Sequence, residues 1–79
     1  MAVAGREIDI TRNIRLIEWL KSELLADVAN LFRLLADGMH EEVHGQASET
    51  LSNIILISYL LGKRLGISYN SVELKISRK

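Results

Sequence analysis

The twenty residues from Ala47 to Gly66, ASETLSNIILISYLLGKRLG, decide the fold of this chain. Their spacing predicts one helix that is apolar over most of its circumference, and a helix of that kind must be buried. Aliphatic side chains project from two opposite faces, and Glu49 and Asn53 lie among those of one face. Basic residues fall in the last turn, and Gly66 is the expected left-handed residue that ends the helix.

The composition limits the class of protein. The chain has 79 residues, 48% of them hydrophobic, with no cysteine, no proline and a formal net charge of zero. A domain of this length has a small core, and its aliphatic composition is typical of a helical protein. Charge neutrality argues against a nucleic-acid partner, and the lack of cysteine excludes a disulfide framework and Cys-ligated zinc.

No apolar run approaches the length of a membrane span. No uninterrupted run is longer than four residues, the length of Ile54–Ile57, whereas a spanning helix needs roughly 20 apolar residues. The N-terminal residues MAVAGREID lack the apolar core of a signal peptide. We therefore expect no membrane partner and a cytoplasmic location.

A long first helix is predicted from about Thr11 to about Ala36, because apolar residues recur there at helical spacing. Ser22 could begin a second segment, so a break near Lys21–Ser22 remains open. Residues 1–8 are expected to be a loose N-terminus, and Asp37-Gly38 ends the helix. The apolar face consists of Ile10, Ile14, Ile17, Leu24, Val28, Leu31 and Leu35.

Two other segments are less clearly patterned. Residues 39–48 could form a loop or an early turn of the central helix, because Gly45 weakens a helix. After Gly66, the sequence Asn70-Ser71-Val72-Glu73 fits a capping box with Asn70 as the cap, which predicts a short helix to about Ser77. The same stretch also alternates as a strand would, but a lone strand would have no partner.

The expected architecture is an all-α, small helical bundle formed by a single domain over residues 1–79. Short connections favour antiparallel neighbours, and the first helix can cover only one apolar face of the central helix. The other face would expose an association-prone patch, so we expect the core to be completed by dimerisation. The two faces are Leu51, Ile54, Ile55, Leu61 and Leu65, and opposite them Leu56, Ile57 and Leu60.

One short motif has the spacing of a zinc site. The residues from His40 to His44, HEEVH, fit the H-E-x-x-H pattern, in which two imidazoles one turn apart hold zinc. A metalloprotease also needs a third protein ligand and a substrate cleft, for which a small helical chain has little room. A fortuitous surface match is the simpler interpretation, so zinc at His40 and His44 is not favoured.

Oxygen-bearing side chains suggest a different metal. Glu23, Asp27 and Asn30 project within about 60° of one another on the first helix, and Glu49 and Asn53 lie on the central helix. If the two helices pack antiparallel, these oxygens converge on a site suited to Mg²⁺ or Mn²⁺, which could orient the phosphates of a nucleotide ligand. The simpler alternative is that Asn30 and Asn53 form a buried polar pair and both glutamates are solvated.

An aromatic side chain among basic ones forms the last candidate. Trp19 and Lys21, with Arg12 and Arg15 nearby, could stack a base or contact a phosphate, so Trp19 and Lys21 are weak substrate-binding candidates. Amphipathic helices commonly carry such residues, and an exposed helix face explains them equally well.

Two stretches of the chain resemble the MazG-like family of all-α nucleotide pyrophosphohydrolases. They are LLADVANLFRLLADG, from Leu24 to Gly38, and SETLSNIILISYLLGKRLGIS, from Ser48 to Ser68, and the likeness covers roughly residues 9–76. The resemblance implies a helical bundle that assembles as a homodimer or homotetramer. It also implies Mg²⁺ held by Glu-Glu-x-x-Glu on one helix and Glu-x-x-Asp on the next, and release of pyrophosphate from nucleoside triphosphates.

Both metal motifs are incomplete in this chain. In place of Glu-Glu-x-x-Glu stands Ala26-Asp27-Val28-Ala29-Asn30, and in place of Glu-x-x-Asp stand Thr50 and Asn53. Glu49 lies about 100° around the helix from the position it would need to fill. The remaining ligand set is Asp27 as the chief ligand, with Asn30, Asn53, Glu23 and Glu49 as further donors.

Two functions therefore remain open. The first is Mg²⁺-dependent cleavage of a nucleoside triphosphate to the monophosphate and pyrophosphate at a degenerate site. The second is a catalytically inactive helical module that binds a ligand or a protein partner, or that oligomerises. Loss of carboxylates favours reduced or lost activity, because carboxylate charge offsets the cost of dehydrating Mg²⁺.

Overall fold

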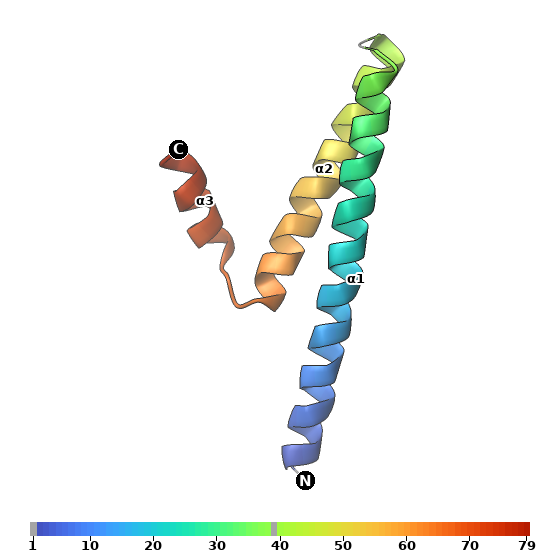
Figure 1. Cartoon of the computed structure of the whole chain (residues 1–79). Coiled ribbons are helices and arrows are strands. Elements are labelled where there is room, and N and C mark those ends of the chain that lie inside the picture. Colours follow the sequence, from blue (N-terminus) through green and yellow to red (C-terminus); the bar gives the residue numbers. More distant parts are fainter. Residues whose placement is uncertain (1, 39) are drawn as a thin grey trace.

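The described residues form three helices. The computed structural model describes the backbone of residues 2–38 and 40–79 and the side chains of residues 10–38 and 40–79. The helices are α1 (Ala2–Ala36), α2 (Glu41–Arg64) and α3 (Tyr69–Ser77), which confirms the predicted all-α class. α1 and α2 form an antiparallel hairpin, and α3 turns back beside α2 (Figure 1). None of the helices, over the residues just named, is both long and apolar enough to cross a membrane.

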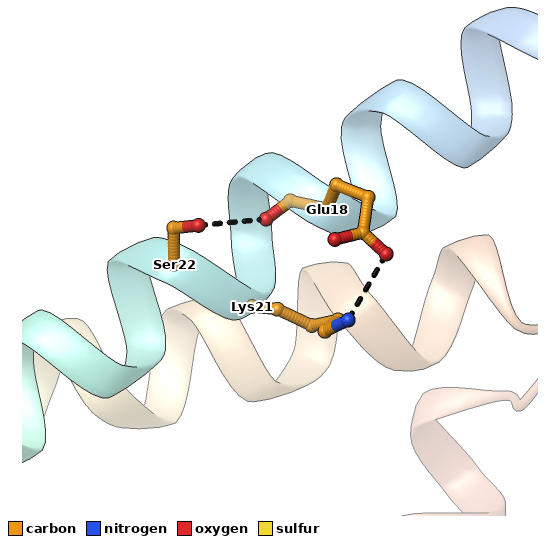
Figure 2. A network of polar contacts seen from close by, with 3 residues as sticks. All are labelled: Glu18, Lys21 and Ser22. Atoms are coloured by element: carbon orange, nitrogen blue, oxygen red, sulfur yellow. Dashed lines mark hydrogen bonds and ion pairs between the residues drawn. The ribbon is translucent and has the colours of Figure 1, made fainter.

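Helix α1 is continuous. It begins at Ala2, nine residues before the expected start, so residues 2–8, predicted to be loose, are helical. The break considered at Lys21–Ser22 does not occur. The Ser22 hydroxyl donates to the carbonyl oxygen of Glu18 at 3.0 Å, and Lys21 Nζ lies 3.0 Å from Glu18 Oε1 (Figure 2). Both contacts span a single helical turn, so Ser22 lies in the helix interior and does not cap a new segment.

Helix α2 begins at Glu41, so most of the undecided segment 39–48 is helical, although residue 39 lies outside the described residues. Its predicted end is confirmed. Gly66 has φ 79°, the left-handed conformation that glycine adopts most readily. The N–H of Ile67 donates to the carbonyl of Gly62 at 2.8 Å, and that of Gly66 to Lys63 at 3.2 Å, which satisfies the last carbonyls of the helix.

Helix α3 confirms that the C-terminal segment is helical. The predicted N-cap, Asn70, is wrong. Ser68, not Asn70, is the N-cap, and its hydroxyl accepts a hydrogen bond from the N–H of Ser71 at 3.1 Å. Glu73 does not complete a capping box, because its carboxylate accepts a hydrogen bond from the Tyr59 hydroxyl on α2. This bond raises the pKa of Tyr59 above its usual range. The rings of Tyr59 and Tyr69 lie 4.4 Å apart, so α3 is held to α2 by an aromatic and polar contact.

The core is a narrow stripe between α1 and α2. Its most buried members are Leu20 and Leu34 from α1, at 4% and 8% exposure, and Val43 and Thr50 from α2, both at 5%. The apolar face predicted for the first helix is only partly right. Ile17, Leu24, Val28 and Leu31 are half-buried, whereas Ile10, Ile14 and Leu35 are exposed.

The central helix is only partly buried within one chain, as expected, but the prediction that the first helix covers one of its two apolar faces is wrong. α1 covers the line between the two predicted faces, so Leu51 and Ile55 are exposed on one side and Leu56 and Leu60 on the other. The chain is only 14 Å deep along its shortest axis. One helix with its side chains is about 10–12 Å across, so the three helices form a single layer, whereas stable domains are built from at least two.

Candidate functional site

A shallow polar depression of about 400 Å³ lies on one side of the α1–α2 hairpin. Its lining brings together four of the five predicted ligands, Asp27 and Asn30 from α1 with Glu49 and Asn53 from α2. The fifth, Glu23, is half-buried on α1 but does not line the depression. The remaining lining residues are Arg33, Leu34, Gln46 and Thr50.

A hydrogen bond between the two helices crosses the floor of this depression. Asn30 Nδ2 donates to the Thr50 hydroxyl oxygen at 3.1 Å. The Asn30 side-chain oxygen in turn accepts a hydrogen bond from the Arg33 guanidinium. Both ends of the Asn30 amide are therefore engaged. The alternative of a buried pair between Asn30 and Asn53 is wrong, because Asn53 is exposed and Thr50 is the partner.

Local helix geometry explains this arrangement. Arg33 follows Asn30 by three residues, so the two side chains lie on the same face of α1. Thr50 falls on the buried row of α2, which it shares with Val43, Ala47 and Ile54. A partly buried amide opposite a threonine hydroxyl forms a hydrogen bond because leaving either group unpaired would cost about 1–3 kcal/mol. Arg33 was not among the predicted site residues, and its only signal in the sequence is its spacing from Asn30.

The side chains of the depression do not fit the magnesium centre that the resemblance implies. The two motifs that the resemblance implies offer five carboxylates to Mg²⁺, an ion that demands near-ideal octahedral oxygen geometry. Only Asp27 and Glu49 supply carboxylates here, while the Asn30 oxygen and the Thr50 hydroxyl accept hydrogen bonds from within the protein. Arg33 also places a positive charge where a cation would need acceptors. Among the residues that the structure describes, no three His, Cys, Asp or Glu side chains are grouped to hold a metal.

The weak substrate-binding candidates lie apart from the depression. Trp19 is 58% exposed, and Lys21 is engaged with Glu18 at 3.0 Å. Two residues apart on a helix, Trp19 and Lys21 project about 200° from each other and so do not share a face. Neither side chain lines the depression.

The two histidines lie near the turn between α1 and α2. His40 is the N-cap of α2, with no side-chain capping bond, and both His40 and His44 are exposed. His44 lines an apolar groove rather than the polar depression. Neither histidine lines the polar depression that contains Asp27 and Glu49.

The apolar groove occupies the other side of the hairpin. Leu51 lines the groove and Asn53 lines the depression, and two residues apart on α2 they project about 200° from each other. Leu35 and Arg33 are divided between the two sides of α1 in the same way. The groove is lined by Leu31, Leu35, Val43, His44, Ala47, Ser48, Leu51, Ser52 and Ile55.

The chain is similar to a known protein family over most of its length. The model of the MazG-like family matches residues 10–79, which include the whole of α2 and α3 and all but the first turns of α1. No curated protein and no solved structure matched the chain. Because the match spans most of the sequence, this chain belongs to the MazG-like family.

Proposed function

We propose that this chain is a non-catalytic MazG-like module, which keeps the helical hairpin but not the magnesium chemistry. Membership of the family suggests a nucleotide pyrophosphohydrolase-type fold. The observation that carries the proposal is the hydrogen bond from Asn30 to Thr50, at 3.1 Å, with Arg33 bonded to the Asn30 oxygen. Asn30 and Thr50 stand at two of the positions where the family motifs have carboxylates, and here they bond to each other. Function lies in the site and not in the fold, so the fold alone does not imply hydrolysis.

The direct test is pyrophosphate release from a panel of ribo- and deoxyribonucleoside triphosphates, with Mg²⁺ or Mn²⁺. The matched control is Asp27→Ala, which removes the one carboxylate left in the first motif. We expect the wild-type protein to release no more pyrophosphate than this variant. Release that disappears with Asp27→Ala would overturn the proposal, because the reduced set of oxygen donors would then support catalysis.

A second test asks whether the hairpin still positions its side chains for a metal. The variant Asn30→Glu with Asn53→Asp restores two carboxylates to the lining of the depression. We expect Mg²⁺ to raise the melting temperature of this variant and not of the wild-type protein, since a cation that binds only the folded state stabilises it. Circular dichroism without metal verifies that the variant folds. Equal stabilisation of both proteins by Mg²⁺ would contradict the loss of the metal site.

One observation favours Mg²⁺-dependent pyrophosphohydrolysis as the second candidate function. Asp27 and Glu49 come from different helices and yet line one depression. In that case Asp27 would be the chief ligand, Glu49 and Glu23 would assist, and the side-chain oxygens of Asn30 and Asn53 would be neutral donors. Arg33 would then have to release Asn30, so the variant Arg33→Met should increase any metal-dependent release. If Arg33→Met does not increase metal-dependent pyrophosphate release and the wild-type protein is inactive, the non-catalytic module is the function that remains.

A further inference from the structure

A second groove, which we call the α3 groove, runs along one face of the C-terminal helix. Its volume is about 610 Å³, within the range of roughly 300–1,000 Å³ that is typical of ligand-binding pockets. Ile67, Val72 and Ile76 supply its apolar part, and Lys75 and Lys79 supply its basic part. Of these side chains, the four that follow residue 71 project within about 100° of one another around the helix.

The rest of the hairpin leaves this groove uncovered. Over the described residues, α3 packs against α2 and makes no contact with α1 (Figure 1). The contact with α2 consists of the hydrogen bond from Tyr59 to Glu73 and the ring contact between Tyr59 and Tyr69. Neither Glu73 nor Tyr69 lines the groove. One side of α3 is therefore held by α2, while Ile67 and Ile76 in the groove remain 45% and 56% exposed.

The formal charge of zero conceals two unlike parts of the chain. Residues 1–49 contain five basic and nine acidic residues, whereas residues 50–79 contain five basic residues and one acidic residue. That acidic residue is Glu73, which is engaged with Tyr59. Lys75 and Lys79 share the groove with no acidic side chain and form no ion pair within the described part of the chain. The groove is therefore a basic surface with an apolar border.

The spacing of these side chains has a natural complement. Lys75 and Lys79 are four residues apart, so they lie on one face of the helix about 6 Å apart along its axis. Val72 and Ile76 form a parallel apolar pair with the same spacing. Carboxylates four residues apart on another helix repeat at this distance, and aliphatic side chains at helical spacing can run beside them. An amphipathic helix with an acidic border is the shape and charge that fit.

We propose that the α3 groove binds an acidic amphipathic helix of a partner protein. Aliphatic side chains of that helix cover Val72 and Ile76, and carboxylates one turn apart pair with Lys75 and Lys79. The nine residues of α3 extend about 14 Å, which accommodates about two and a half turns of a partner helix. The inference goes beyond the proposed function, because it depends on α3 and not on the polar depression.

A membrane surface fits these observations less well. A helix that lies in a membrane interface buries a broad apolar face, whereas α3 contributes only Val72 and Ile76 to the apolar part of the groove. The groove is also concave, while a bilayer is flat on the scale of one short helix. The nine acidic residues of residues 1–49 would oppose attraction to anionic lipids.

The first experiment tests the charges. The probe is a fluorescent peptide of about 15 residues, long enough to form a helix, with a leucine row bordered by glutamates. Fluorescence anisotropy with the full chain should show binding, and a peptide with glutamine in place of glutamate should bind severalfold more weakly. Lys75→Gln with Lys79→Gln should remove this preference.

The matched control for the lysine pair is Lys63→Gln with Arg64→Gln. It changes the net charge equally, but neither residue lines the α3 groove. Near physiological salt, where charges more than about 8 Å away are largely screened, this control should keep the preference for glutamate. No binding of the glutamate peptide, or equal loss in both variants, would overturn the proposal.

The second experiment tests the apolar part of the groove with two variants of the same helix. Ile76→Asn alters a groove residue that is 56% exposed, and Leu74→Asn alters one that is 52% exposed and outside the lining. We expect Ile76→Asn to weaken binding of the glutamate peptide severalfold and Leu74→Asn to leave it unchanged. Circular dichroism verifies that both variants remain helical. Equal effects of the two substitutions would contradict docking in the groove.

Two further measurements test other occupants. If vesicles of phosphatidylserine and phosphatidylcholine bind the chain through Lys75 and Lys79 while the peptide does not, the groove faces lipid and the proposal is wrong. If the lysine variant abolishes self-association and the peptide does not bind, the occupant is a second copy and the proposal is equally wrong. None of these assays measures pyrophosphate or metal binding, so their failure is distinguishable from failure of the proposed function.

Discussion

The two sides of the α1–α2 hairpin differ in chemistry although they come from the same two helices. One side presents carboxylates, amides and a guanidinium in a polar depression, and the other presents leucine and isoleucine side chains in an open groove. Only a narrow stripe around Leu20, Leu34, Val43 and Thr50 separates them. The two sides are therefore separated by a single row of buried residues. A substitution on one side need not disturb the side chains on the other.

This difference separates two properties that are easily confused. The polar side carries the side chains on which the proposed loss of metal chemistry depends, and the apolar side carries exposed aliphatic side chains. A protein can lose carboxylates from the first side and keep the second intact, because aliphatic packing does not depend on them.

The stripe between the two sides should be the most sensitive place to mutation. Leu20→Ala removes a side chain that is 4% exposed, and we expect it to lower the free energy of unfolding by about 2–4 kcal/mol. The control Ser22→Ala removes an exposed hydroxyl bonded to its own helix and should change stability by less than about 0.5 kcal/mol. Urea denaturation at fixed protein concentration measures both. Equal effects would mean that the stripe is not the core.

On the polar side, the hydrogen bond between Asn30 and Thr50 should contribute more to stability than the exposed side-chain amide of Asn53. Thr50→Val keeps the shape of a residue that is 5% exposed but leaves Asn30 Nδ2 without its acceptor, at a cost of about 1–2 kcal/mol. Asn53→Ala, at an exposed position of the same depression, should cost less than about 0.5 kcal/mol. Thermal denaturation compares the two. The reverse order would restore the pairing of Asn30 with Asn53 that the structure excludes.

Replacing the two glycines near the ends of α2, Gly45 and Gly66, with alanine should change the stability of the protein in opposite directions. Gly66 has φ 79°, so Gly66→Ala should destabilise the protein by about 1 kcal/mol. Gly45 lies within α2, and a Cβ built there meets nothing within 4 Å. Gly45→Ala should therefore stabilise the protein by about 0.5–1 kcal/mol. Denaturant midpoints of the two variants should move in opposite directions, and a shift of both in one direction would refute the argument.

Helix α3 belongs to neither side of the hairpin. Weakening its contact with α2 should have the smallest effect, limited to amide exchange within α3. Tyr59→Phe removes the hydrogen bond to Glu73 and keeps the ring contact with Tyr69, so amide exchange should accelerate within α3 and not within α1. Because that bond raises the pKa of Tyr59 in the folded state, its contribution is present below the ordinary tyrosine pKa of about 10 and is lost as the pH rises through the higher folded value.

A matched variant distinguishes the hydrogen bond from the charge. Glu73→Gln keeps an acceptor for the Tyr59 hydroxyl, and its effect on exchange in α3 should be smaller than that of Tyr59→Phe. Hydrogen–deuterium exchange near neutral pH measures both variants. If α3 exchanges equally fast in all three proteins, the Tyr59–Glu73 contact does not hold it.

Local pattern predicted the two long helices of this protein, although not that they begin at Ala2 and Glu41. The period of the apolar residues predicted both long helices, and Gly66 marked the end of α2 because a left-handed residue after the last turn is a local requirement. The convergence of Asp27, Asn30, Glu49 and Asn53 was also predictable, since antiparallel helices with known faces bring these positions together. These features depend on neighbours within a few residues or on the helical period.

Tertiary structure decided how each helix is rotated about its axis and which partner each polar group finds. The apolar circumference of α2 permits several rotations, and packing against Leu20 and Leu34 selected the row that contains Thr50. That choice gave Asn30 the Thr50 hydroxyl and left Asn53 exposed. Glu73 likewise bonds to Tyr59 from another helix and not to its own cap. The helical period is local, whereas rotation and pairing depend on side-chain packing between segments distant in sequence, which no single helix pattern contains.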